Sequence, residues 1–158
     1  MKGCKSTLGT DSYTAESVEE DAHIVKILVD NGAIPFVKSN VPELCFTYHT
    51  SNNLFGTAEN PWKRDRTCGG STGGEAGLVS ANISPFGVGS DTGGSIWVPA
   101  NFCGVVGFMP THKRVSTFGN RAYSGADHYS IEPVNVCVGP ITRTVDNEIL
   151  LMKILFET

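Results

Sequence analysis

The chain has 158 residues, of which 40% are hydrophobic and 18% are charged, and its formal net charge is −4. This length suffices for one domain with a sizeable core, and the composition is ordinary for a globular α/β protein. The acidic balance provides no basic surface for nucleic acid, and the longest apolar runs, at residues 24–29 and 149–156, are far too short to span a membrane.

Helix and strand patterns alternate along the chain. Residues 1–15 are polar and rich in turn formers, whereas residues 19–31 have the apolar spacing of an amphipathic helix that ends at an Asn-Gly pair. A short strand of the buried type is predicted at residues 34–37, and residues 41–61 are predicted to form an irregular loop.

The second half of the chain continues this alternation. A helix is predicted at residues 75–81, and a closing helix at residues 144–156, where apolar positions recur at helical spacing. Three strands are predicted between them, at residues 86–90, 105–108 and 135–138. Such alternation favours an α/β fold with a mixed sheet covered by helices.

The most distinctive part of the chain is the tract dense in glycine and serine between Gly69 and Gly107. Glycines beside hydroxyl groups commonly bring backbone N–H groups close to a ligand or a reacting atom. A flexible linker would lack the apolar residues that interleave this tract, so we expect it to be folded. Ser71 and Ser95, which are 24 residues apart, occupy matching places in its two GGS triplets.

The tract contains GGSTGGE, GSDTGGSI and PANFCGVVGFMPT in that order. These sequences resemble the signature of the amidase signature family of serine hydrolases, including the separation of the two serines. Upstream, the stretch IPFVKSNVPELCFTYHTSNNLFGTAENPW is most similar to the fatty acid amide hydrolase branch. The resemblance runs over nearly the whole chain and implies that residues 1–158 form part of an amidase signature domain.

This resemblance implies a role for each serine. Ser95 corresponds to the nucleophile, which forms the acyl-enzyme, and Ser71 to the serine that relays a proton between the nucleophile and a lysine. The family places the relay serine after a cis peptide bond, here Gly70–Ser71. The oxyanion hole corresponds to Thr92, Gly93, Gly94 and Ser95. A helix is expected to begin at Ser95, with its N-terminus favouring the developing anion.

Three features depart from the family pattern. The family's lysine lies in an apolar strand about six residues before the position that aligns with Lys2, so this chain is expected to lack it. Lys38 lies much closer to Ser71 than the family's lysine does, and we interpret it as a surface lysine. Trp97 stands where most members have arginine, and Met109 stands where the pattern has lysine.

Other kinds of site find little support. The five cysteines are odd in number and form no C-x-x-C pair, so we expect neither a metal site nor a disulfide framework, and no cofactor. The four histidines lack zinc spacing, and Glu75 stands where a P-loop requires lysine.

The cysteine content makes a reduced, cytosolic compartment the default expectation for the location of this chain. No signal peptide is visible, and a membrane anchor of the amide hydrolase branch would precede Met1.

Two classes of function remain open. The first is an amidase that hydrolyses a small carboxylic amide, in particular a fatty acid amide, through an acyl-enzyme on Ser95; a fragment of an amidotransferase subunit is the alternative within this class. The second is a truncated, non-catalytic product, because the lysine strand and the C-terminal half of the family's domain are expected to be absent. The chain by itself is expected to be inactive.

Overall fold

The structure is a computed structural model that describes residues 1–13, 17–120, 130–131 and 134–156. At its centre lies an antiparallel sheet of three strands in the order β5-β9-β6. These strands are β5 (Phe86–Asp91), β9 (Cys137–Thr142) and β6 (Val106–Gly107). Every residue of β9 is buried, so the sheet is covered on both faces along this strand.

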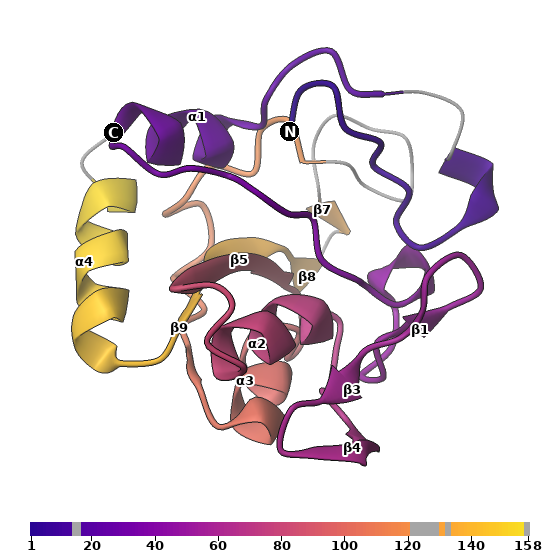
Figure 1. The fold of residues 1–158 in the computed structure, drawn as a ribbon. Helices are drawn as coiled ribbons and strands as arrows, with labels where there is room; N and C mark the ends of the chain where they lie inside the picture. The colour runs from indigo at the N-terminus through magenta and orange to yellow at the C-terminus, as the bar shows by residue number, and fades with distance from the viewer. Residues whose placement is uncertain (14–16, 121–129, 132–133, 157–158) are drawn as a thin grey trace.

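One face of the sheet is covered by α1 (His23–Asp30) and α4 (Val145–Phe156). Figure 1 shows these two helices, which come from distant parts of the sequence, next to each other at the edge of the molecule. Leu28 of α1 and Leu151 of α4 are buried in one apolar cluster with Val138 of β9. The apolar face of each helix therefore attaches it to the sheet.

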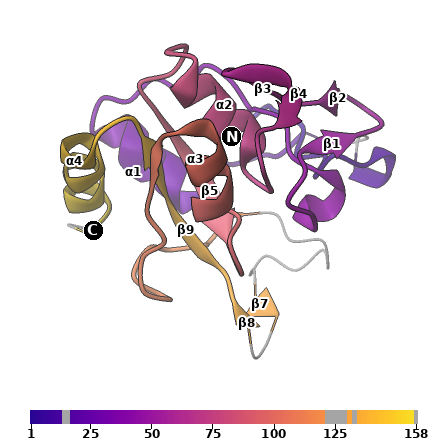
Figure 2. The ribbon, with the colours of Figure 1, turned by 90° about the horizontal axis from the view of Figure 1, so that it is seen from below.

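The other face of the sheet is covered by α2 (Gly73–Ser80) and α3 (Trp97–Cys103). Val79 of α2 and Cys103 of α3 form a second cluster with Ile141 of β9, and all three side chains are fully buried. Because Val138 and Ile141 are three positions apart on one strand, they point to opposite faces. Figure 2 shows α1 and α4 on one side of β9 and α3 on the other.

Shorter elements surround this core in the described part of the chain. Three pairs of short strands are antiparallel: β1 (Ser51–Asn52) with β2 (Gly56–Thr57), β3 (Glu59–Asn60) with β4 (Lys63–Thr67), and β7 (Ser130–Ile131) with β8 (Val134–Asn135). Two 3-10 turns lie at Asp11–Tyr13 and Glu43–Cys45. None of the described helices is long and apolar enough to cross a membrane.

The predicted α/β class is confirmed, and several elements lie close to their predicted bounds. The structure places α2, β5 and α4 within two residues of the predictions. The first helix is shorter than predicted, because Ala22 is still extended and α1 begins at His23. The strand predicted at residues 135–138 is divided, since Asn135 ends β8 and the longer β9 begins at Cys137.

Two predictions for the first half of the chain were wrong. Residues 34–37 form no strand and are not buried, with Ile34 85% and Phe36 60% exposed. A β-strand requires a neighbour to pair with, and these residues pair with none of the described strands. Residues 41–61 are more regular than predicted, because they contain the hairpin of β1 and β2 and also β3.

We predict that Gly139→Ala destabilises the chain by at least about 2 kcal/mol, because the added methyl group would collide with the backbone carbonyl of Phe108. Gly77→Ala in α2 is the matched control. There the methyl group would meet only the Cys68 sulfur, at 3.2 Å, and alanine favours a helix, so the change should stay within about 1 kcal/mol. Urea-induced unfolding of both variants measures the difference. Equal effects would contradict the proposed packing of β9.

Candidate active site

Ser71 lies in the loop that precedes α2, and its side chain is buried. The peptide bond between Gly70 and Ser71 is cis, as the family resemblance implied. Thr50 holds this loop from both sides. Its hydroxyl donates to the Gly69 carbonyl at 2.8 Å and accepts the Gly73 N–H at 3.1 Å. The position of Ser71 is therefore fixed by contacts on either side of it.

Gly70 is packed too closely for a side chain. A Cβ atom there would lie 2.5 Å from the Thr47 carbonyl oxygen and 3.0 Å from the His49 nitrogen. Both contacts are with backbone atoms, which cannot rotate away as a side chain can. The segment 47–49 therefore lies directly against the loop of Ser71.

Ser95 lies in the loop between β5 and α3, which the carboxylate of Asp91 organises. One Asp91 oxygen accepts the Gly94 N–H at 2.6 Å, and the other accepts the Ile96 N–H at 2.6 Å. Asp91 is only 1% exposed, so these charge-assisted hydrogen bonds compensate for the removal of its charge from water. The backbone on both sides of Ser95 is thereby attached to the end of β5.

Other backbone groups near Ser95 are also engaged. The Ser95 carbonyl accepts the Thr72 N–H at 3.2 Å, and the Gly94 carbonyl accepts the Val98 N–H at 2.8 Å. Among the described residues, the N–H groups of Thr92, Gly93 and Ser95 donate no hydrogen bond. Three of the four predicted oxyanion residues thus retain an N–H that a ligand could use, whereas the Gly94 N–H is engaged by Asp91.

The two serine loops are joined through the backbone. The hydrogen bond from the Thr72 N–H to the Ser95 carbonyl connects the residue after one serine to the other serine itself. Within the described residues, no hydrogen bond links the two serine hydroxyls directly. The helix after Ser95 begins at Trp97, two residues later than predicted.

Among the described residues, no hydrogen bond joins a lysine side chain to Ser71 or Ser95. Lys38 is exposed, as predicted, and its Nζ donates to the Lys5 carbonyl at 2.7 Å. Of the four histidines, His128 lies outside the described residues. His49 makes its side-chain hydrogen bond with Thr67, at 3.0 Å, rather than with a serine.

A cavity of about 650 Å³ adjoins the loop of Ser71. Its lining is mostly apolar and includes Phe36 and Val88, but Ser71, Glu75 and Lys38 also line it. Burial raises the pKa of Glu75 from its usual range to about 7, and the neighbouring Ser39 hydroxyl opposes this shift. A carboxyl group that titrates near neutral pH therefore lies four residues after Ser71, on the first turn of α2.

Aromatic side chains flank the Ser95 loop. Trp97 is 52% exposed, and a Cβ atom on Gly94 would lie 3.2 Å from its indole ring and 3.2 Å from the ring of Tyr48. Tyr48 also donates its hydroxyl to the Gly93 carbonyl at 2.6 Å. Sequence reasoning did not identify Tyr48 or Thr50, because both act through contacts with residues far away in the sequence.

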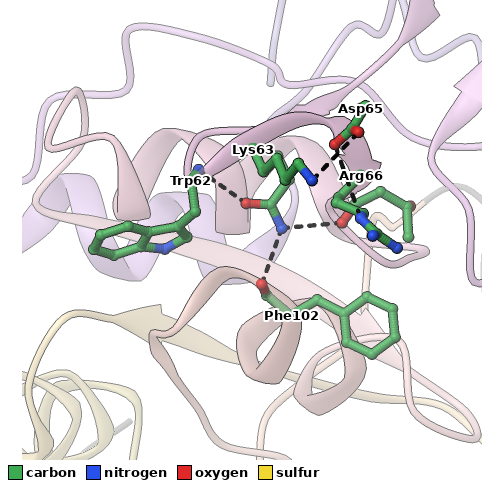
Figure 3. A network of polar contacts seen from close by, with 7 residues as sticks. Trp62, Lys63, Asp65, Arg66 and Phe102 are labelled. Carbon is green, nitrogen blue, oxygen red and sulfur yellow. Dashed lines mark hydrogen bonds and ion pairs between the residues drawn. The ribbon is translucent and has the colours of Figure 1, made fainter.

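The sequence NPW, at residues 60–62, connects the β3–β4 hairpin to α3 through hydrogen bonds. Asn60 donates to the carbonyls of Thr67, at 3.0 Å, and Phe102, at 2.9 Å, and accepts the Trp62 N–H at 3.0 Å. The Trp62 indole N–H donates to the Cys103 carbonyl at 2.8 Å. Figure 3 shows the bond to Phe102, which joins the β3–β4 hairpin to the end of α3. This network holds the helix that follows Ser95.

Comparison with known proteins gives consistent matches. The protein-family model described as Amidase matches residues 1–158. Fatty-acid amide hydrolase 1 from Sus scrofa is 42% identical over 154 residues, which are 98% of this chain and 26% of the relative. The glutamyl-tRNA(Gln) amidotransferase subunit from Methanosarcina acetivorans is 41% identical over 135 residues, which are 85% of this chain and 27% of the relative.

Solved structures of the same two kinds of protein also match this chain. A structure of fatty acid amide hydrolase matches with a TM-score of 0.89 and 33% identity, covering 97% of this chain and 26% of that one. The glutamyl-tRNA(Gln) amidotransferase subunit from Thermotoga maritima matches with a TM-score of 0.87 and 34% identity, covering 98% and 32%. The chain thus spans about a quarter to a third of the length of these relatives.

We predict that Glu75→Gln becomes increasingly stabilising as the pH rises. The pKa of Glu75 in the folded chain, about 7, lies above its ordinary value of 4.5, so the folded state binds this proton more tightly than the unfolded state does. Wild-type stability should therefore fall between pH 5 and pH 8, by about 2 kcal/mol relative to the variant, which has no proton to lose. Urea unfolding of both proteins at the two pH values tests this. A difference that does not change with pH would show that the carboxyl group is not buried.

Proposed function

The chain belongs to the amidase signature family, and from this premise we propose that it forms the nucleophile-bearing part of a serine hydrolase that cleaves carboxylic amides. The observation that carries the proposal is the Ser95 loop. A glycine-lined turn leaves the N–H groups of Thr92, Gly93 and Ser95 without a partner in the described structure, while Asp91 holds the backbone around them. An amide carbonyl that becomes an oxyanion requires such donors.

The proposed reaction proceeds through an acyl-enzyme. The Ser95 hydroxyl oxygen attacks the amide carbonyl carbon, its proton passes to Ser71, and the developing oxyanion accepts hydrogen bonds from the N–H groups of Gly93 and Ser95. The amine leaves with a proton from the same relay, and water then hydrolyses the ester on Ser95. In support, the backbone bond between Thr72 and Ser95 holds the two serine loops against each other.

A base must complete the relay, and we propose that a lysine upstream of Met1 in the whole protein provides it, giving the Ser-Ser-Lys triad of the family. Lys38 is a poor candidate because its ammonium group is exposed and donates to the Lys5 carbonyl. The 158 residues alone would then hold the nucleophile without its base. We therefore propose that this chain in isolation is inactive.

A fatty acid amide is the proposed substrate class, which would place the protein in lipid metabolism. The 42% identity to fatty-acid amide hydrolase 1 supports this choice. A second support is Trp97, whose half-exposed indole beside Ser95 offers an apolar contact where most members of the family have a charged arginine. The competing proposal is an amidotransferase subunit, since relatives of that kind are 38–44% identical.

A fluorophosphonate probe, which labels activated serines, tests the proposed function. We expect the isolated chain to be labelled weakly or not at all, and a longer protein with the upstream lysine segment to be labelled strongly. Removing the base of such a relay commonly costs several powers of ten in rate, because its members act together (an effect on the order of 10³ or more). Ser95→Ala should abolish the labelling of the longer protein.

Two labelling results would contradict these proposals. Strong labelling of the 158-residue chain that Ser95→Ala removes would show that the chain needs no upstream lysine. Labelling of the longer protein that survives Ser95→Ala would overturn the assignment of the nucleophile. Comparing hydrolysis of a long-chain fatty acid amide with that of glutamine then distinguishes the two proposed substrate classes.

A further inference from the structure

Residues 47–49 form a strap that lies between the two serine loops. On one side, the backbone of Thr47 and His49 contacts Gly70, where a Cβ atom would have no space. On the other side, the ring of Tyr48 reaches the loop of Ser95, and a Cβ atom on Gly94 would lie 3.2 Å from Tyr48 Cε1. The strap is thus placed to fix one loop relative to the other.

The side chain of Tyr48 acts on one particular peptide unit, the one between Gly93 and Gly94. Its hydroxyl donates to the carbonyl oxygen of this unit at 2.6 Å, while the N–H of the same unit donates to Asp91 at 2.6 Å. A peptide unit is planar, so holding its two polar ends fixes the orientation of the whole plane. Without such contacts a Gly-Gly peptide rotates easily, because both flanking residues lack a Cβ atom.

This peptide unit joins the segment that carries the Gly93 N–H to the segment that carries the Ser95 N–H. The torsions at its two ends, ψ of Gly93 and φ of Gly94, set how these two N–H groups are oriented relative to each other. The N–H of Gly93 precedes the unit and the N–H of Ser95 follows it, and both are without a partner among the described residues. Gly94 has φ of +131°, a conformation that only glycine adopts readily, so the chain turns sharply at this point. A change in either torsion would therefore alter the angle between the Gly93 and Ser95 N–H groups, and a flip of the plane itself would turn the Gly93 carbonyl to the opposite side of the loop.

We propose that Tyr48 is a positioning residue for the oxyanion-binding N–H groups of Gly93 and Ser95. Its hydroxyl holds the Gly93 carbonyl away from the position of the oxyanion, so that the loop presents donors there instead of an acceptor. This role rests on the proposed amidase function. Tyr48 itself touches neither the substrate carbonyl nor Ser95 in this role, and it acts through the backbone.

Replacement of Tyr48 by phenylalanine isolates this contribution. The ring and its contact with Gly94 remain, and only the hydroxyl that bonds the Gly93 carbonyl is lost. Because Tyr48 is 57% exposed, water can hydrate the released carbonyl, and the fold should keep its stability. The stabilisation of the transition state should decrease more. Loss of one oxyanion donor lowers kcat by about a hundredfold or more, and a misaligned donor should lower kcat by a smaller factor.

The test uses the longer, lysine-containing protein and compares Tyr48→Phe with Tyr13→Phe, the same change in the 3-10 turn at Asp11–Tyr13. We expect Tyr48→Phe to lower kcat for an amide, and the rate of fluorophosphonate labelling, by about tenfold, with KM changed less than about twofold. Tyr13→Phe should leave kcat, KM and the labelling rate unchanged, and Tyr48→Phe should keep the melting temperature of the wild type. Unchanged kcat in Tyr48→Phe, or an equal loss in Tyr13→Phe, would overturn the proposal.

A second measurement separates this proposal from the proposed function. Amide hydrogen exchange of Gly94 should become faster in Tyr48→Phe than in the wild type, because the peptide unit is then held at one end only, and it should be unchanged in Tyr13→Phe. Lack of labelling in the wild-type longer protein would refute the proposed function without affecting this readout. Equal exchange of Gly94 in wild type and Tyr48→Phe would refute the positioning role in either case.

Discussion

The arrangement around Ser95 depends on the two hydrogen bonds that the buried carboxylate of Asp91 accepts, from the N–H groups of Gly94 and Ile96. Asp91 is the last residue of β5 and pairs with Cys137 of the central strand, so the sheet and the Ser95 loop share one anchoring residue. A buried charge without partners would be costly, and these bonds satisfy it only while the loop keeps its shape. The loop geometry is therefore coupled to the core and does not depend on loop residues alone.

The same face of the sheet positions the second serine. Both α2 and α3 pack on Ile141, and each begins directly after one of the serine loops. Several glycines serve this packing rather than the chemistry. A Cβ atom on Gly89 of β5, for example, would lie 2.6 Å from the side chain of Thr72. The glycine density of the tract thus has two causes, since it brings helix and sheet close together and also leaves backbone donors accessible near Ser95.

Local patterns in the sequence were sufficient to predict α4 and β5. The helix α4 was predicted because its apolar spacing matches its contact with the sheet, and β5 because residues 86–90 lead out of a glycine-rich turn. The apolar run at residues 34–37 has the same local character, but a strand also needs a paired neighbour, which periodicity does not reveal. The serine pair was identified from spacing and family resemblance. Tyr48 was not, because its hydroxyl meets Gly93 across 45 positions of the sequence.

The cavity beside Ser71 adds a constraint on the base of the proposed relay. Glu75 is largely buried there, and its burial raises its pKa because the surroundings disfavour charge. The same desolvation acts in the opposite direction on an amine, because the charged form of an amine is the protonated one. For the lysine that we propose as the base, burial in surroundings of this kind would favour the neutral amine, which can accept a proton from a serine. An ionised Glu75 would oppose that effect, because a carboxylate stabilises the protonated form of a neighbouring amine. Lys38 also lines this cavity, but it is exposed and its ammonium group donates to the Lys5 carbonyl. The buried, apolar part of the lining beside Glu75 therefore suits a proton acceptor better than a fixed positive charge.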